Sequence, residues 1–244
     1  MKLSLLLGLG IALIAISQPV RAGGFEPKIV VQAPENVFVP MGFDDNDNSQ
    51  IILFANMPDT CHKAGPVRYR IDEAKRTIFI RNEILYYSGC WCADVQVPYT
   101  QTVNVGLLNS GEYKVAVETS TGTFKKMADI PIAAATTAAP DDSLYAPVEQ
   151  VIFAKGKESV GNGEVILTGT FRSSCMQLKD VRLNYRQNHV IEVLPIVEMA
   201  ASGGCTEELR PFTARIKIKD SVGGRALLHV RSLSGQAINQ VIEL

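Results

Sequence analysis

The apolar and polar positions of this chain alternate over short stretches and do not follow a helical period. Val67, Tyr69 and Ile71 alternate with Arg68 and Arg70, which is the period of a strand with one buried face. Other short apolar segments recur at roughly ten-residue spacing, with turn residues between them: 28–31, 37–39, 51–54, 78–80, 115–117, 165–167, 190–196, 212–218, 226–230 and 238–244. No long amphipathic helix is indicated. The sequence therefore predicts an all-β protein of sandwich type.

Part of this pattern occurs twice. Cys92 stands six residues before Pro98, and Cys205 stands six residues before Pro211. Apolar positions after each proline then fall in step: Val103 and Val105 with Ile216 and Ile218, and Val115 and Val117 with Leu228 and Val230. We interpret the repeat as two tandem β-sandwich modules, each closed by one disulfide.

The repeat also suggests boundaries. We expect a first module over 23–132, a linker over 133–146 and a second module over 147–244. The linker is rich in Ala and Thr, contains Pro140 and shows no apolar period. A mature chain of about 220 residues could form one domain or two, and the repeat favours two. Domains of about 100 residues bury a modest core, so a covalent cross-link helps them most.

The N-terminus has the features of a secretory signal peptide over residues 1–22. Lys2 supplies a positive charge, Leu3–Ile16 is apolar, and Ala22 is a small residue suited to cleavage. The apolar run is about fourteen residues, shorter than the roughly 20 that span a bilayer. We therefore expect a secreted or periplasmic protein with no transmembrane segment after cleavage.

Charge argues against two classes of partner. The chain has 24 basic and 25 acidic residues, and removal of Lys2 and Arg21 would leave 22 against 25, a net charge of −3. No basic cluster remains in the mature chain. We therefore expect no nucleic-acid partner and no patch for an anionic membrane.

Export makes disulfides the default state of the five cysteines. Matching positions in the two copies predict the pairs Cys61–Cys92 and Cys175–Cys205. Cys90 has no counterpart in the second copy. It could be a small buried residue, form a bridge between chains, or replace Cys92 as the partner of Cys61.

One segment resembles a known class of domain. Leu108, Gly111, Tyr113, Val115 and Val117 are similar to the late strand of immunoglobulin-like sandwiches in bacterial envelope proteins. The resemblance implies two tandem immunoglobulin-like sandwiches. It also implies that Tyr113 hydrogen-bonds to the backbone at a sheet corner. Ala226, the counterpart of Tyr113, cannot make this bond.

Metal-binding and catalytic patterns are weak. Asp44, Asp45 and Asp47 lie in an acidic turn that could hold calcium, but an EF-hand loop would need Gly at position 49 and Glu at position 55, where this chain has Ser and Ala. Cys61, His62, Cys90 and Cys92 have poor spacing for zinc. No Gly-x-Ser-x-Gly motif occurs. We expect a non-enzymatic protein without a metal or cofactor.

The strongest candidate contact residues are the aromatic side chains Tyr86, Tyr87 and Trp91 before Cys92. Such residues are enriched at interface hot spots, although they could instead fill the core beside a disulfide. We combine them with the acidic turn, Asp44, Asp45 and Asp47, as one candidate surface. The expected function is binding or adhesion to a protein or cell-surface partner. The alternative is a structural or assembly accessory protein of the bacterial envelope.

Overall fold

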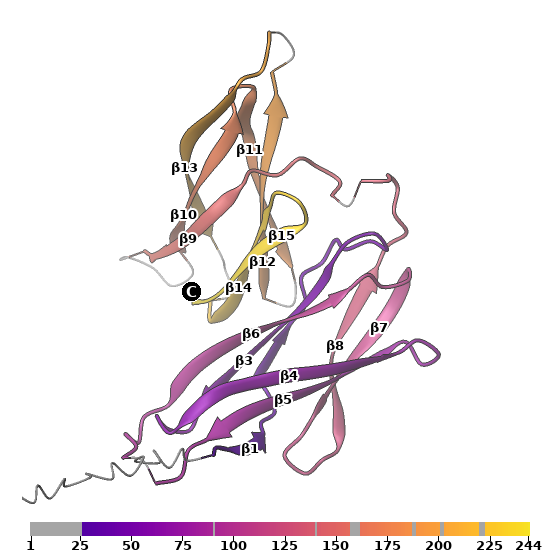
Figure 1. Ribbon diagram of the computed structural model, residues 1–244, viewed down its shortest axis with the longest axis vertical. Helices are drawn as coiled ribbons and strands as arrows, with labels where there is room; N and C mark the ends of the chain where they lie inside the picture. The colour runs from indigo at the N-terminus through magenta and orange to yellow at the C-terminus, as the bar shows by residue number, and fades with distance from the viewer. Residues whose placement is uncertain are drawn as a thin grey trace, which may run out of the picture.

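The computed structural model describes residues 26–89, 91–139, 141–156, 162–186, 189–200, 203–219 and 223–244. All regular elements within these ranges are β-strands, as the hydrophobic pattern predicts (Figure 1). Nothing in the described residues is a helix of the length and apolar character needed to cross a membrane. The expected signal peptide, residues 1–22, and Cys90 lie outside the described residues.

Strands β1 to β8 form the first half of the molecule. Their bounds are Lys28–Val31, Asn36–Phe38, Ser49–Met57, His62–Asp72, Thr77–Tyr86, Val97–Gly106, Gly111–Glu118 and Phe124–Ile132. One sheet contains β4, β5, β7, β8 and β1, with β1 and β7 sharing the edge of β5 opposite β4. The facing sheet has the antiparallel order β2-β3-β6.

Strands β9 to β15 form the second half. Their bounds are Val148–Lys155, Asn162–Ser173, Met176–Arg186, Val190–Met199, Glu207–Lys219, Arg225–Ser232 and Gln236–Glu243. One sheet has the order β13-β10-β9 and the other has the order β11-β12-β14-β15. Apart from β1, each sheet has the same strand order as its counterpart in the first half.

The pairing register is also repeated. Thr77 of β5 pairs in parallel with Lys114 of β7, and Val190 of β12 pairs in parallel with Leu227 of β14. Both residues of the second pair lie 113 positions after their counterparts in the first pair. A one-residue slip in either pair would reverse the faces of every following side chain, so the shared register places equivalent residues on equivalent faces.

Each half has its own apolar core between its two sheets. In the first half Ile78, Ile80 and Val115 are fully buried in one cluster. In the second half Val193 and Val230 are fully buried in another. These residues alternate along their strands with residues that face away from the core, which is why the period-2 pattern in the sequence marks the strands.

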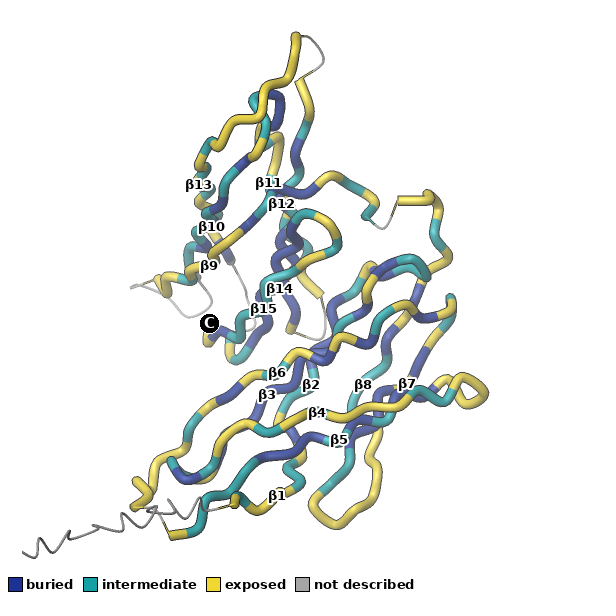
Figure 2. The backbone as a smooth tube through the Cα atoms, in the orientation of Figure 1, coloured by how far each residue is buried: buried dark blue, intermediate teal, exposed yellow. Residues whose placement is uncertain are grey.

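A third apolar cluster joins the halves. Phe38, Ile52 and Phe54 of β2 and β3 pack against Val190 and Leu227 of β12 and β14. In Figures 1 and 2, β14 and β15 lie beside β3 and β6, and dark blue buried segments meet there. The two sandwiches are therefore packed against each other through side chains as well as joined by the chain.

The ends of the expected linker belong to the two halves. The amide of Ala133 donates to the carbonyl of Phe43 over 3.0 Å. Tyr145 forms a bridge with Ile196, and Ala146 is fully buried in the second core. The segment that connects the halves without joining either core is therefore shorter than 133–146.

The immunoglobulin-like expectation is not confirmed. Immunoglobulin sandwiches consist of two antiparallel sheets, whereas β5 pairs with β7 in parallel and β12 with β14 in parallel. The Tyr113 hydroxyl donates to a side chain, Glu73 Oε2, over 2.6 Å. Tyr113 thus joins the start of β7 to the turn between β4 and β5.

Candidate functional site

Two disulfides hold corresponding places in the halves, and both predicted pairs are confirmed. Cys61 is bonded to Cys92 with a Cα–Cα distance of 5.3 Å. Cys175 is bonded to Cys205 with a Cα–Cα distance of 5.4 Å. Each bond ties the turn that follows β3 or β10 to the segment that precedes β6 or β13. In the first half this is the end of the sandwich that carries the predicted aromatic residues.

Trp91 is fully exposed to solvent. Its neighbour Cys92 is fixed by the disulfide, and the amide of Ala93 donates to Thr60 Oγ1 over 2.8 Å. The sequence left open whether Trp91 fills the core or faces solvent, and the structure places its side chain outside the core. It stands on a backbone segment that is covalently anchored.

Tyr86 and Tyr87 are only partly exposed. The Tyr86 ring stacks on the His62 ring with a centroid distance of 4.8 Å. His62 Nδ1 lies 2.7 Å from Asp59 Oδ1, and this hydrogen bond lowers the pKa of Asp59. Tyr86 therefore supports the end of the sandwich, and Trp91 is its most accessible aromatic side chain.

The same end contains a group of potential metal ligands. The ligand atoms of Asp59, Cys61 and Cys92 lie within 4.8 Å of one another. Structural zinc needs deprotonated thiols, and these two sulfur atoms are bonded to each other. The arrangement is that of a disulfide with a neighbouring carboxylate.

The acidic turn lies elsewhere. Asp47 precedes β3, whereas the Cys61–Cys92 bond lies beyond the other end of this nine-residue strand. A strand of that length spans about 30 Å. The structure therefore contradicts the expectation that Asp44, Asp45 and Asp47 form one surface with Tyr86, Tyr87 and Trp91.

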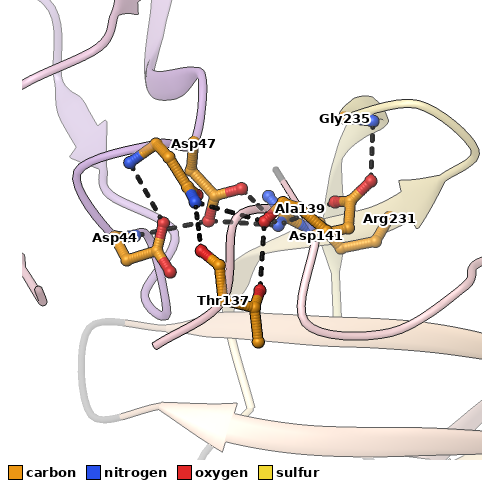
Figure 3. A network of polar contacts seen from close by, with 8 residues as sticks. Asp44, Asp47, Thr137, Ala139, Asp141, Arg231 and Gly235 are labelled. Carbon is orange, nitrogen blue, oxygen red and sulfur yellow. Dashed lines mark hydrogen bonds and ion pairs between the residues drawn. The ribbon is translucent and has the colours of Figure 1, made fainter. Parts of the chain in front are cut away.

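The acidic turn instead faces the connecting segment and the second half (Figure 3). Asp45 Oδ1 accepts a hydrogen bond from the amide of Ala135 over 2.9 Å. Asp44 Oδ1 accepts from the amide of Asn46 over 3.2 Å. Asn46 Nδ2 donates to the carbonyl of Thr137 over 2.9 Å. These bonds fix the turn and leave its carboxylates engaged within the chain.

Asp47 is paired with Arg231 of β14 (Figure 3). Arg231 Nη2 lies 3.2 Å from Asp47 Oδ1 and 3.2 Å from Asp141 Oδ1. The exposed fractions are only 4% for Asp47 and 8% for Arg231. Burial raises the pKa of Asp47 above its usual range, although the nearby guanidinium acts in the opposite direction. The pair is a buried charge contact between the halves.

A second polar contact between the halves lies on the same face of the sheet formed by β11, β12, β14 and β15. Glu192 of β12, with an exposed fraction of 3%, accepts a hydrogen bond from the amide of Met41 over 2.8 Å. Its other carboxylate oxygen accepts from Arg186 Nη2 over 2.9 Å. A polar cavity of about 190 Å³ lies beside these groups, and both halves line it through Met41, Gly42, Glu192, His229 and Arg231.

His229 of β14 lies beside Glu192, with which it is paired in register. Asn239 Nδ2 donates to Gln50 Oε1 over 3.0 Å, so Asn239 Oδ1 faces His229 Nδ1, which lies 2.8 Å away. We therefore assign the proton of the neutral ring to Nδ1. Nε2 is buried and has no hydrogen-bond partner among the described residues. Burial lowers the pKa of His229 to about 4.

These groups fasten the two halves together. Asp47, Asp141 and Glu192 each have a cationic or amide partner, and His229 is neutral near pH 7. Sequence reasoning missed Glu192, His229 and Arg231. The available signal was a polar residue at every second position of apolar segments, as in Leu228-His229-Val230-Arg231. That signal marks the sheet face opposite the core but does not say what covers it.

Comparisons with known proteins address the first half alone. Residues 54–125 match the family model of the ORF11 beta-sandwich domain. The match extends from the end of β3 to the start of β8 and includes Cys61, Trp91 and Cys92. No curated protein and no solved structure matches the chain. The family match agrees with the observed sandwich architecture of this part of the chain.

Proposed function

We propose that this chain is an exported, non-enzymatic binding protein that contacts its partner through Trp91. The observation that supports the proposal is the fully exposed indole beside the Cys61–Cys92 disulfide. Tryptophan is among the residues most enriched at interface hot spots. Its backbone is already held by a covalent bond, so binding would cost less conformational entropy than it would from a free loop.

The disulfides support a function outside the cytoplasm. The two disulfides indicate an extracellular or otherwise oxidising environment. We propose secretion or periplasmic export through the signal peptide at residues 1–22. The partner would be a protein or a cell-surface component that is met after export.

We further propose that the two halves are tandem copies of one sandwich unit. The repeated strand order, the shared 113-residue offset and the two matching disulfides support duplication. An immunoglobulin-like ancestor would need parallel pairing of β5 with β7 and of β12 with β14 to have arisen in its larger sheet. In this two-unit arrangement, the second half gives rigid support and the distal end of the first half makes the contact.

Site-specific photo-crosslinking in the native envelope tests the function. A photoreactive amino acid replaces Trp91 in one protein and Leu209, an exposed apolar residue of β13, in the control. We expect a discrete adduct from position 91 and none from position 209. Trp91→Ala should lower capture of the same partner while leaving the thermal midpoint unchanged.

The same experiment distinguishes the proposed binding function from the alternative, a structural or assembly accessory protein. Equal adducts from both positions, or none from position 91, would contradict the proposed contact. Adducts that consist of further copies of this chain in large complexes would favour the structural or assembly accessory function.

A further inference from the structure

The two halves carry equivalent rows of side chains on the outer face of their larger sheets. In the second half the row is Asn184, Glu192, His229 and Asn239, each paired in register with the next. In the first half the row is Arg70, Phe79, Ala116 and Lys126. The strand order and register are the same, so the rows occupy the same place on the two sandwiches.

In the second half this face is already occupied. The chain from Met41 to Asp47 lies on it, with the Met41 amide on Glu192 and the Asp47 carboxylate on Arg231. The occupant is thus an acidic turn, and the face holds it through an arginine. The arginine itself is not repeated, because the first half has Glu118 at the position equivalent to Arg231. The arginines that the first half presents on this face instead include Arg68 and Arg70 of β4.

In the first half the equivalent face is open. A groove of about 210 Å³ lies there, lined by Arg68, Arg70, Phe79, Arg81, Glu118 and Phe124. Phe79 and Phe124 meet edge to face with a centroid distance of 5.0 Å. The groove therefore combines an aromatic floor with three guanidinium groups.

The charges in this groove are unequally compensated. Arg81 is paired at 2.7 Å with both Glu83 and Glu118. Arg68 lies 3.4 Å from Glu83 and its side chain is largely exposed. The Arg70 guanidinium rests 3.9 Å above the Phe79 ring and forms no ion pair with the described residues. Among the three guanidinium groups of the groove, that of Arg70 is therefore the most available to a ligand, and the Phe79 ring holds it in place.

The apolar part of the contact is not repeated. Val190, Leu227 and Val241 pack against the first half. At the equivalent paired positions, β5, β7 and β8 have Thr77, Lys114 and Asp129. The open face thus lacks the apolar area for permanent packing of another sandwich, and its polar surface suits a reversible ligand.

We propose that the groove formed by Arg68, Arg70, Phe79 and Phe124 binds an acidic peptide segment of a partner protein. A carboxylate of the segment pairs with the Arg70 guanidinium, whose planar fork matches it. An adjacent apolar side chain lies against Phe124. This site is separate from the proposed contact at Trp91.

The chain supplies its own probe for the test. A fluorescein-labelled peptide with the sequence of residues 43–47, Phe-Asp-Asp-Asn-Asp, is titrated with the full protein in fluorescence polarisation. The control peptide carries Asn at the three Asp positions. We expect saturable binding of the acidic peptide and not of the amide peptide. Salt should weaken this binding, because the groove is open to solvent.

Variants identify the groove. Arg70→Gln should lower the affinity about tenfold through loss of one charged contact. Arg68→Gln should lower it less, because Arg68 already lies near Glu83. The matched control is Arg182→Gln, the equivalent of Arg68 in the second half, which should bind like the unmodified protein. Denaturation midpoints of all variants should agree, since these side chains are exposed.

Two results would overturn the proposal. One is equal affinity for the acidic and the amide peptide, or unchanged affinity in a folded Arg70→Gln protein. The other is binding of phosphatidylglycerol vesicles that depends on Arg70, without binding of the peptide, which would assign the groove to a membrane surface.

Discussion

Arg231 Nη2 lies 3.2 Å from Asp47 Oδ1, although the two residues are 184 positions apart in the chain. The contact crosses from β14 in the second half to the turn before β3 in the first. It places Asp47 of the acidic turn in the interior of the protein. Asp141 completes the site by accepting from the same nitrogen and from the amide of Gly235.

Breaking this pair should destabilise the protein strongly. Arg231→Met leaves Asp47 buried without its cation, and such a loss costs about 3–5 kcal/mol of unfolding free energy. Urea denaturation at pH 7 measures the change. The control is Arg215→Gln, which removes an exposed partner of Glu164 and should cost less than about 1 kcal/mol. Similar losses in both variants would contradict a buried role for Arg231.

His229 should make stability depend on pH. Its pKa is about 4 in the folded protein against 6.5 ordinarily. The unfolded chain therefore binds one more proton between these values, and stability is lost as pH falls from about 6.5 to about 4. At 1.36 kcal/mol per pKa unit the loss is about 3 kcal/mol.

Denaturation curves of the unmodified protein and His229→Gln at pH 7 and pH 4.5 check this. The variant should lose less stability on acidification. Asp47, whose raised pKa favours the folded state on acidification, and the fixed charge of Arg231 act in both proteins. The difference between the two proteins thus isolates the histidine. Equal losses would show that His229 is protonated without penalty.

Gly169 should not tolerate a side chain. It lies where β10 passes β9 at an irregular step, and a Cβ atom there would stand 2.0 Å from the carbonyl oxygen of Pro147. The backbone has to move, so Gly169→Ala should cost about 1–3 kcal/mol. Gly204→Ala is the control, because nothing lies within 4 Å of the position that a Cβ atom would take there. Thermal midpoints that shift equally would refute the close approach.

The disulfide of the second half should stabilise the folded protein by constraining the unfolded chain. Replacing Cys175 and Cys205 together by Ala opens a loop of 30 residues, worth about 3–4 kcal/mol in the chain-entropy model. This bond is preferred to Cys61–Cys92 for the test, because Cys90 could react in place of Cys92. Denaturation of the oxidised protein with and without the substitutions measures the effect. Unchanged stability would indicate that the bond constrains little.

The repeat and the alternation in the sequence are enough to predict most strands and both disulfide pairs. The segment from Val67 to Ile71 forms a strand as expected, and Val67 and Ile71 pack against the core. Tyr69, which the alternation would also place inward, is exposed. Spacing from Cys61 and Cys175 identified the sulfur partners, since equivalent positions of a repeated sheet bring equivalent residues together. Pairing direction was beyond this reasoning: nothing in 77–80 or 114–117 distinguishes a parallel from an antiparallel neighbour.

The candidate surface was only partly predictable. Trp91 could fill a core or face solvent, and both interpretations fit an aromatic residue beside a cysteine. Charged turns are usually solvated, whereas Asp47 is buried by the second half. That burial depends on the orientation of one sandwich on the other, which is set by contacts 150 to 190 positions apart, such as Met41 with Glu192 and Arg225 with Glu35.

The apolar cluster of Phe38, Ile52 and Phe54 with Val190 and Leu227 has a consequence for how the molecule melts. If either sandwich opened alone, the other would present these side chains, and the charges beside them, to water. We therefore expect the two units to unfold together. The whole chain should give one cooperative heat-absorption peak in a calorimeter rather than two.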